Sequence, residues 1–289
     1  MSKCVLKQRK ALENGPDEAA AADGEDASVV GAKSTSVRRR QRRILKMISD
    51  KGFASIDDLA HAFSVTPQTI RRDINELSRE GLLRRYHGGA GVTTSTENYA
   101  YSDRKILCHQ EKERIAALVA KHIPNQASLF INIGTTTEEV AKALCNHDRL
   151  RVITNNLNVA SILSAQENLE VIVAGGLVRR KDSGIVGEAA IDFIQQFRVD
   201  YGIIGISGID MDGALLDFDY REVRAARAII DNSRKTFLVT DHTKFGRNAM
   251  VRLGDICEID ALFTDQRPPA ALVEKLEACD VKLFVADKS

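Results

Sequence analysis

The stretch Ser64-Val-Thr-Pro-Gln-Thr-Ile-Arg-Arg-Asp-Ile-Asn-Glu-Leu77 decides the fold of the first part of the 289-residue chain. Thr66 is a good helix cap, and Pro67 loses no hydrogen bond at a first helical position, so a helix is expected from residue 67. Its apolar side chains lie within about 60° of one another on a helical wheel and are Ile70, Ile74 and Leu77. Its polar side chains form a separate arc of about 100° and are Gln68, Arg71, Arg72 and Asn75.

A second helical pattern comes just before this stretch. Ser55 and Asp58 have the spacing of a capping box, with Asp where Glu or Gln is usual. Apolar residues then recur with helical spacing at Ile56, Leu59, Ala60 and Phe63. Two short helices joined by a tight turn predict a helix-turn-helix. We expect the apolar face of the second helix to pack on Ile44, Met47, Ile48, Leu59 and Phe63.

The polar arc carries side chains of the types that recognise DNA bases. Guanidinium and amide groups bond to guanine and adenine edges in the major groove, at roughly 1–3 kcal/mol of discrimination for each good pair. Backbone N–H groups at the start of the helix favour a phosphate. After Gly81, a short strand pattern ending at Gly88-Gly89 predicts a wing along the phosphate backbone. The predicted DNA contacts are Thr66, Gln68, Thr69, Arg71, Arg72, Asn75, Arg84, Arg85 and His87. Each of them singly could instead be a solvated side chain or a simple cap.

Charge supports the same location for a nucleic-acid site. Residues 38–90 hold 12 Lys or Arg and 6 Asp or Glu, a net charge of +6, whereas the whole chain has +1. A basic module on an otherwise acidic protein is expected of a nucleic-acid binder, because only the part that faces phosphates needs a positive field. A solvated basic face is the alternative explanation.

The remaining sequence divides into distinct segments. Residues 1–36 are predicted to be a flexible tail, 37–92 a winged helix-turn-helix domain, 93–110 a linker, and 111–289 an α/β domain. In the last segment, short apolar runs alternate with helical patterns, which predicts βαβ units and a mostly parallel sheet.

No run approaches the ~18 apolar residues that span a bilayer, and no signal-peptide pattern begins the chain. We therefore expect a cytoplasmic protein that does not insert into a membrane.

The five cysteines are scattered, odd in number and form no CxxC pair. This spacing argues against a disulfide framework and against a zinc site. No GxGxxG follows a predicted strand and no Walker-type GxxxxGK[ST] is present, so dinucleotide and ATP binding lack their motifs. No metal and no cofactor are expected.

Polar residues follow several predicted strands of the second domain. Ser128–Ile133 leads into Gly134-Thr135-Thr136-Thr137, where a strand, a glycine and a helix start form an anion-binding arrangement. The carboxyl ends of parallel strands share one edge of the sheet, where ligands bind, and Lys244 supplies a full charge for a phosphate. We predict a pocket for a phosphorylated, polyhydroxylated small molecule, formed by Gly134, Thr135, Thr136, Thr137, Thr154, Asn155, Asn156, Gly175, Gly176, Asp210 and Lys244. Each of these singly could be an ordinary turn residue.

Both halves resemble one family. Residues 64–77 with the following Arg-Arg-Tyr-His-Gly-Gly-Ala closely resemble the amino-terminal domain of the DeoR family of bacterial repressors, in which the segment matching residues 54–73 is the helix-turn-helix. The runs 130–137, 154–156, 174–176 and 241–250 are similar to the family's effector domain, which is related to sugar-phosphate isomerases. The resemblance extends from about Val37 to the end, and runs 204–210 and 216–220 are similar to a glycerol-3-phosphate-responsive member. It implies operator DNA as a partner, a homo-oligomer, and glycerol 3-phosphate as an inducer that weakens operator binding.

Two other functions fit parts of the sequence. A sugar-phosphate isomerase with a DNA-binding appendage would use Asp210 or Lys244 as acid or base groups, but shared fold is only analogy. No carboxylate–His pair at a fixed short spacing supports it. A basic module that binds any duplex without choosing its sequence is the third possibility.

Overall fold

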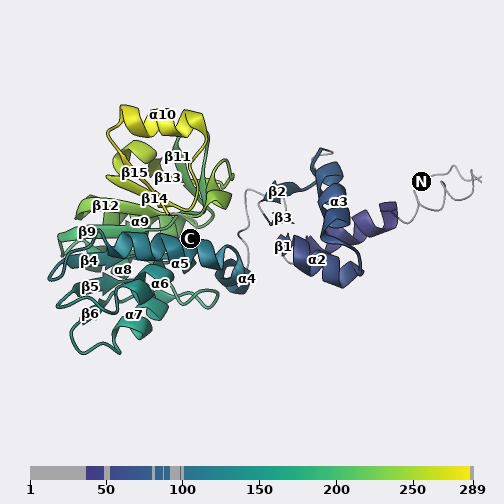
Figure 1. Cartoon of the computed structure of the whole chain (residues 1–289). Helices are drawn as coiled ribbons and strands as arrows, with labels where there is room; N and C mark the ends of the chain where they lie inside the picture. The colour runs from purple at the N-terminus through teal and green to yellow at the C-terminus, as the bar shows by residue number, and fades with distance from the viewer. Residues whose placement is uncertain are drawn as a thin grey trace, which may run out of the picture.

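The computed structural model describes residues 37–48, 53–79, 82–86, 88–91, 98 and 101–286. The predicted tail 1–36 and the predicted wing contact His87 lie outside these residues. The described chain forms a small domain, within residues 37–91, and a large domain, residues 108–286, which can be followed in Figure 1. We call residues 92–107 the connector; its described part is Asn98 and residues 101–107.

The small domain is a winged helix-turn-helix. Residues 37–48 are helical, and the elements after them are β1 (Phe53–Ser55), α2 (Ile56–Phe63), α3 (Pro67–Arg79), β2 (Arg84–Tyr86) and β3 (Gly89–Gly91). The three strands form one antiparallel sheet in the order β1-β3-β2. The predicted start of α3 at residue 67 is confirmed.

Local chemistry explains where these helices begin and end. Ser55 caps α2 by accepting a hydrogen bond from the Asp58 N–H at 3.0 Å, as predicted. The Asp58 carboxylate, however, accepts from the Ser55 hydroxyl at 2.7 Å, because an Asp side chain is shorter than the usual Glu. Ser64 ends α2 with a left-handed backbone (φ 50°), which makes the tight turn. Thr66 then accepts from the Thr69 N–H at 3.3 Å and starts α3.

One apolar core holds the small domain together. Ile70, Ile74 and Leu77 are buried against the helix at 37–48 and α2, as the apolar arc predicted. Leu83 is buried in the same core, whereas the neighbouring Leu82 is exposed. Met47 and Phe63, two of the predicted partners, pack at the edge of this core.

The large domain is built on a seven-stranded, fully parallel sheet. Its strand order is β15-β14-β12-β9-β4-β5-β6. The strands are β4 (Ser128–Ile131), β5 (Arg151–Thr154), β6 (Glu170–Val173), β9 (Val199–Ile204), β12 (Ser233–Val239), β14 (Ala261–Thr264) and β15 (Lys282–Val285). The predicted α/β class with a mostly parallel sheet is confirmed.

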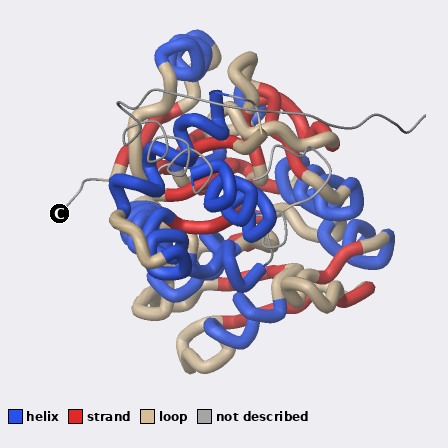
Figure 2. Tube along the Cα trace, turned by 90° about the vertical axis from the view of Figure 1, so that its right-hand side faces the viewer, coloured by secondary structure: helices blue, strands red, loops and turns tan. Residues whose placement is uncertain are grey.

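Helices cover both faces of this sheet (Figures 1 and 2). Leu129 and Ile131 belong to one core and the intervening Phe130 to the other, because successive strand side chains point to opposite faces. One core is covered by α5 (His109–Ala120), α6 (Thr135–Ala143) and α7 (Leu157–Leu163). The other is covered by α8 (Glu188–Ile194), α9 (Tyr220–Asp231) and α10 (Ala270–Ala278).

The strand order reverses at one place in the sheet. From β4 the chain adds β5 and β6 on one side, and then returns to place β9, β12, β14 and β15 on the other. β4 and β9 are neighbours with parallel pairing, so the chain leaves their carboxyl ends in opposite directions. This reversal opens a crevice at the carboxyl ends of the two strands, where ligands bind in open α/β sheets.

Smaller elements surround this crevice. The connector contains α4 (Tyr101–Ile106), within the predicted linker 93–110. An antiparallel sheet is formed by β10 (Gly208–Ile209), β11 (Ala214–Asp217) and β13 (Val251–Asp255). The remaining elements are the hairpin of β7 (Leu177–Val178) and β8 (Ile185–Val186) and the 3₁₀ turns η1 (His242–Lys244) and η2 (Ile256–Glu258).

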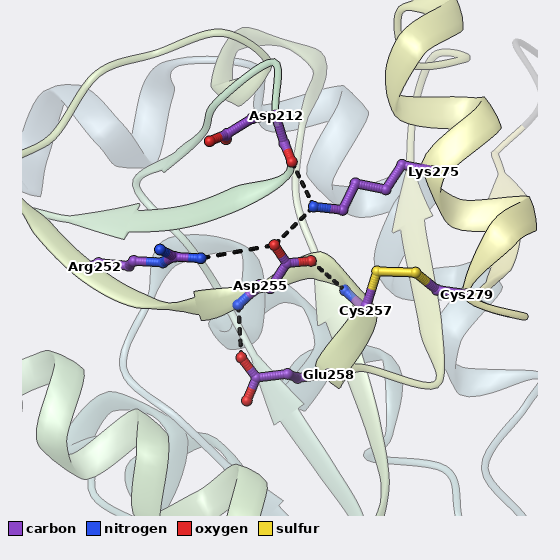
Figure 3. The surroundings of a disulfide bond; sticks show 7 residues. All are labelled: Asp212, Arg252, Asp255, Cys257, Glu258, Lys275 and Cys279. Carbon is purple, nitrogen blue, oxygen red and sulfur yellow. Dashed lines mark hydrogen bonds and ion pairs between the residues drawn. A yellow bond between two sulfur atoms is a disulfide. The ribbon is translucent and has the colours of Figure 1, made fainter.

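The structure corrects the expectation of no disulfide. Cys257, in η2, is bonded to Cys279, which follows α10, with their Cα atoms 5.3 Å apart (Figure 3). Lys275 ties the same two elements together by donating to Asp255 at 2.7 Å (Figure 3). The sequence argument was wrong for this pair because it considered spacing along the chain, and folding brings together cysteines 22 residues apart.

Candidate functional site

The exposed face of α3 carries the predicted DNA contacts. Gln68, Arg71 and Arg72 are exposed, and Thr69 and Asn75 are half-buried. The Thr66 and Thr69 hydroxyls are 2.9 Å apart and share a hydrogen bond at the start of the helix. Side chains that can read base edges thus lie on the side of α3 opposite its core, as the helical wheel predicted.

Ion pairs fix the orientation of α3. The Arg40 guanidinium donates to both oxygens of the buried Asp73, at 2.5 and 3.0 Å. The bond to Asp73 raises the pKa of Arg40. Gln41 donates to Glu76 at 2.8 Å in the next turn of α3. The helix at residues 37–48 therefore holds α3 in a defined position, which base readout requires.

The wing contacts both the recognition helix and the large domain. Arg85 donates to Asn75 on α3 at 3.0 Å, so these two predicted DNA contacts are bonded to each other. A side chain at Gly246, in the loop after η1, would meet the Arg84 Nη2 atom at 3.0 Å. A predicted phosphate contact of the wing thus lies against the large domain.

The candidate effector cavity lies in the crevice between β4 and β9. Its walls are formed by the segments after these strands, by α5, β11 and α9, by the loop at η1 and by the connector. The lining residues are Asn98, Arg104, Lys112, Ile133, Gly134, Thr135, Thr136, Gly205, Ile206, Ser207, Asp217, Glu222, Lys244 and Arg247. The cavity volume is about 30 Å³.

One end of the cavity is suited to an anion. Gly134 has φ 155° and no side chain to cap α6, so the first N–H groups of this helix are left for a ligand. Lys112 and Lys244 are only 2% and 8% exposed. The Lys112 ammonium donates to the carbonyls of Arg104 and Leu107, and among the described residues no carboxylate lies within 4.0 Å of it. Two buried cations and a helix start together favour a phosphate.

Charge is tightly coupled around Lys244. Burial lowers the pKa of Lys244 to about 8, with repulsion from Arg247 and Lys112 adding to the effect and Asp241 opposing it. Asp241 lies at the base of η1, fully buried. Burial disfavours its charged form, but Lys244, Lys112 and hydrogen bonds from Thr243 outweigh this and lower its pKa to about 2. A phosphate beside Lys244 would further favour the charged form of this lysine.

Another part of the lining carries carboxyl groups, beside the guanidinium groups of Arg104 and Arg247. Burial and the nearby Glu222 raise the pKa of Asp217 to about 7. Asp217 accepts from the Ser207 hydroxyl at 3.0 Å, and Glu222 is paired with Arg179 at 2.7 Å. Carboxyl, hydroxyl and amide groups of this kind donate to and accept from alcohol groups. The lining therefore has partners for a phosphate and for hydroxyls.

Only part of the predicted effector site lines this cavity. Gly134, Thr135, Thr136 and Lys244 do so. Thr137 follows in α6 and donates to the carbonyls of Asn132 and Gly134. The other predicted residues do not line it, and they are Thr154, Asn155, Asn156, Gly175, Gly176 and Asp210.

The residues away from the cavity make other contacts. Thr154 donates to the carbonyl of Ile131 and Asn155 to that of Ile185. Asn156 caps α7, and Asp210 accepts from the Met211 N–H in the β10–β11 turn. Gly175 and Gly176 follow β6, an edge strand two places from β4. The strand ends do share one edge, but the sheet is wide: the segments after β4, β9 and β12 reach the crevice, and those after β5 and β6 do not line it.

Sequence reasoning missed most of the remaining lining residues. Lys112, Arg104 and Asn98 come before the first strand of the sheet and carry no motif that points to a ligand. The run Asp217–Glu222 does carry a signal in the sequence, because its density of carboxylates fits a polar site as well as a helix start. Asp219 does cap α9, while Asp217 and Glu222 line the cavity.

Two groups of described residues have the donor types of a metal site. They are Cys108, Asp241 and His242, and, on the surface, His109, Glu113 and Glu139. Lys244 lies 4.0 Å from Asp241, and Lys142 lies 2.9 Å from Glu139. Because an ammonium lies beside one carboxylate of each group, the charges of these groups do not favour a cation.

Within the described ranges, no helix combines the length and the apolar character needed to cross a bilayer.

Two family models match the chain. The model described as "DeoR-like helix-turn-helix domain" matches residues 40–96, and that described as "DeoR C terminal sensor domain" matches residues 107–266. The two matches correspond to the small domain and to most of the large domain.

Curated relatives match over almost their whole length. The glycerol-3-phosphate regulon repressor of Escherichia coli (strain K12) is 53% identical over 245 residues, covering 85% of this chain and 97% of that protein. The protein of the same name from Haemophilus influenzae is 50% identical, covering 86% and 96%. The transcriptional repressor CsqR of Escherichia coli is 43% identical, covering 85% and 94%.

Solved structures show weaker likeness. Ribose 5-phosphate isomerase A from Neisseria gonorrhoeae aligns with a TM-score of 0.35 and 12% identity, covering 46% of this chain and 52% of that one. A tetrameric eIF2B complex from C. thermophilum aligns with a TM-score of 0.45 and 15% identity, covering 88% and 95%. At these scores no functional conclusion follows.

Proposed function

The chain belongs to the DeoR family of helix-turn-helix transcriptional repressors, and we propose that it represses genes of glycerol 3-phosphate metabolism. The small domain binds operator DNA, with α3 in the major groove and the wing on the phosphate backbone. Glycerol 3-phosphate binds in the crevice of the large domain and releases the operator.

The observation that carries the ligand assignment is the chemistry of the cavity lining. The lining combines the start of α6 and the buried Lys112 and Lys244 with Asp217 and Ser207. A short molecule with one phosphate and neighbouring hydroxyls matches both sets of groups. The names of the relatives that are at least 50% identical support the same compound.

The proposal includes the assembly and compartment of the protein. A helix-turn-helix repressor acts in most cases as a dimer or a larger symmetric oligomer, because two half-sites multiply its affinity and selectivity. We propose a cytoplasmic homo-oligomer, since operator DNA and a phosphorylated metabolite are both found there.

Operator binding at a fixed salt concentration tests the function. We expect operator affinity to fall when glycerol 3-phosphate is added, while the affinity for a scrambled duplex stays low throughout. Lys244→Ala should bind operator but lose the response to the ligand, because it removes a buried charge at the phosphate end. A response to another sugar phosphate but none to glycerol 3-phosphate would refute the ligand assignment and keep the repressor assignment.

We assign the protein as a regulator rather than an enzyme. Of the two acid–base groups that an isomerase would use, Lys244 lines the cavity but Asp210 lies in the β10–β11 turn. Turnover of ribose 5-phosphate by the purified protein, abolished in Lys244→Ala, would contradict this assignment.

A further inference from the structure

The effector cavity is too small for the ligand that its chemistry favours. Its volume of about 30 Å³ corresponds to one or two water molecules. A phosphorylated three-carbon alcohol is several times larger than that. At least one wall must therefore move before the ligand can bind, and the position of that wall differs between the empty and the occupied protein.

The walls of the cavity differ in how closely they are packed into the large domain. Gly134, Thr135 and Gly205 follow central strands of the sheet, and Lys112 lies in α5 above one of the two cores. Moving any of these would disturb close packing, which is costly in a protein interior. Asn98 belongs to the connector and is bound to the wall through its side chain.

Asn98 lies in the cavity lining beside Ser207 and Arg247. Its Nδ2 donates to the Ser207 hydroxyl at 3.1 Å, and its Oδ1 accepts from Arg247 Nη2 at 2.9 Å. Arg247 Nη1 donates to the Ser207 carbonyl at 3.0 Å, and the Ser207 hydroxyl donates to Asp217. These partners are the hydroxyl, guanidinium and carboxyl groups that the alcohol groups of a ligand would use. Asn98 and the ligand therefore compete for the same partners.

Asn98 is also connected to the DNA-binding domain by two routes. Along the chain it stands between β3, which ends at Gly91, and α4. Through space, its partner Arg247 is next to Gly246, which lies against Arg84 of the wing. Near the other end of α4, Leu107 packs on Phe53 of β1. A shift of Asn98 thus changes the connector and the loop on which the wing rests.

We propose that Asn98 is a latch which the ligand displaces: bonded to Ser207 and Arg247 it holds the empty, DNA-binding arrangement, and its release opens the cavity and frees the wing. The inference rests on the proposed function and adds the link between its two sites. A ligand shifts an equilibrium only if its affinities for the two states differ. Asn98 provides this difference in affinity, because it occupies the ligand's partners in the closed state only.

The full-length variant Asn98→Ala tests the latch. It removes the side-chain hydrogen bonds to Ser207 and Arg247 without changing a residue of the sheet or the cores. We expect the DNA-free variant to bind glycerol 3-phosphate about tenfold more tightly in a calorimetric titration, in line with the typical energy of such bonds. Operator affinity without the ligand should fall by a similar factor, and saturating ligand should then reduce it less than in the wild type.

The control is Ser102→Ala, which changes an exposed residue of the same connector whose hydroxyl contacts only the adjacent Asp103 in the described structure. It should behave as the wild type in both assays. Weaker ligand binding by Asn98→Ala would make Asn98 a ligand contact and overturn the latch, and so would values equal to those of Ser102→Ala. A wild type that binds no glycerol 3-phosphate would instead contradict the proposed function, and the latch with it.

Discussion

Single buried charges give the effector cavity its selectivity. Lys112 and Lys244 are nearly inaccessible, and a desolvated cation is costly unless a partner compensates it. Asp241 compensates Lys244 in part, at 4.0 Å. A phosphate that enters gives both lysines a full partner, whereas a neutral molecule of the same size does not. The cavity is therefore expected to discriminate between glycerol and glycerol 3-phosphate by charge.

Asp217 makes a pH-dependent prediction possible at the level of one residue. Its pKa is raised by burial and by Glu222 to about 7 in the folded protein, against about 3.9 in an unfolded chain. Between these values the folded protein binds the extra proton, so stability falls as pH rises. The contribution of a protonated Asp217 is complete below about pH 4 and is lost as the pH rises through about 7.

We therefore expect Asp217→Asn to lose less stability than the wild type between pH 5 and pH 8, by an amount on the order of one to a few kcal/mol. Asn keeps an acceptor for Ser207 and for the Phe218 N–H. Urea denaturation at both pH values measures the difference. The control is Asp192→Asn, an exposed position in α8. Equal pH dependence in all three proteins would show that Asp217 is not buried as a neutral acid.

The residues of the site were predictable only where local sequence decides their role. Gly134-Thr-Thr136 and Lys244 were found because a strand end, a glycine and a helix start form a local pattern. Asn156 looked similar but caps α7 and donates to Glu138. Asn98 and Lys112 reach the cavity only through the packing of the connector and α5 on the sheet. Nothing in their own sequence neighbourhoods marks that contact.

At the level of elements, α3 and the wing should differ in what they contribute to DNA binding. Arg71 and Arg72 project from α3, and Arg84 and Arg85 belong to β2. Arg71→Ala or Arg72→Ala should reduce the preference for operator over scrambled duplex by roughly 1–3 kcal/mol. Arg84→Ala or Arg85→Ala should weaken binding to both duplexes and lower the slope of log affinity against log salt by about one unit.

Fluorescence anisotropy across a salt series, with both duplexes, measures these effects. Lys282→Ala in β15 removes a basic residue of the other domain and serves as the control. If all four arginine variants lose affinity equally on both duplexes, then α3 does not provide the sequence preference separately from the affinity that the wing provides. The Arg85–Asn75 bond predicts one mixed effect, since loss of Arg85 also frees Asn75 on α3.

Elements were predicted well where caps and apolar periodicity agree. α3 begins at Pro67 as expected, because Thr66 and the apolar arc indicate the same boundary. The cap of α6 was harder to predict: the Thr135–Glu138 spacing resembles a capping box, yet Gly134 is the cap. Glu138 instead accepts from the Tyr101 hydroxyl at 2.7 Å. That contact comes from α4, so a tertiary interaction overrides the local pattern.

For the whole molecule, the path of the chain explains why the effector site and the DNA-binding domain are connected. The reversal of strand order places the cavity between β4 and β9, next to the loop after η1. Asn98 and Arg104, described residues of the connector, lie at this position and form part of the wall. Parallel strands and a winged helix-turn-helix could be expected from sequence. The contact of Asn98 and Arg104 with the cavity could not, because it depends on how two separate domains are joined.

The disulfide allows a prediction for the large domain as a unit. Cys257–Cys279 closes a loop of 22 residues that contains β14 and α10, and such a crosslink stabilises a fold by about 3 kcal/mol. Reduction should therefore lower the urea midpoint of the large domain and leave that of the small domain unchanged.

Cytoplasmic thiols are normally kept reduced, and Lys275 would then hold η2 and the end of α10 together through Asp255 and the Asp212 carbonyl (Figure 3). Cys257→Ser should match the reduced wild type and should no longer respond to dithiothreitol, whereas Cys145→Ser, at a free cysteine, should retain the response. A large-domain midpoint that dithiothreitol does not change in the wild type would mean that the two sulfurs are not bonded in solution, or that the ion pairs alone set the stability of this edge of the sheet.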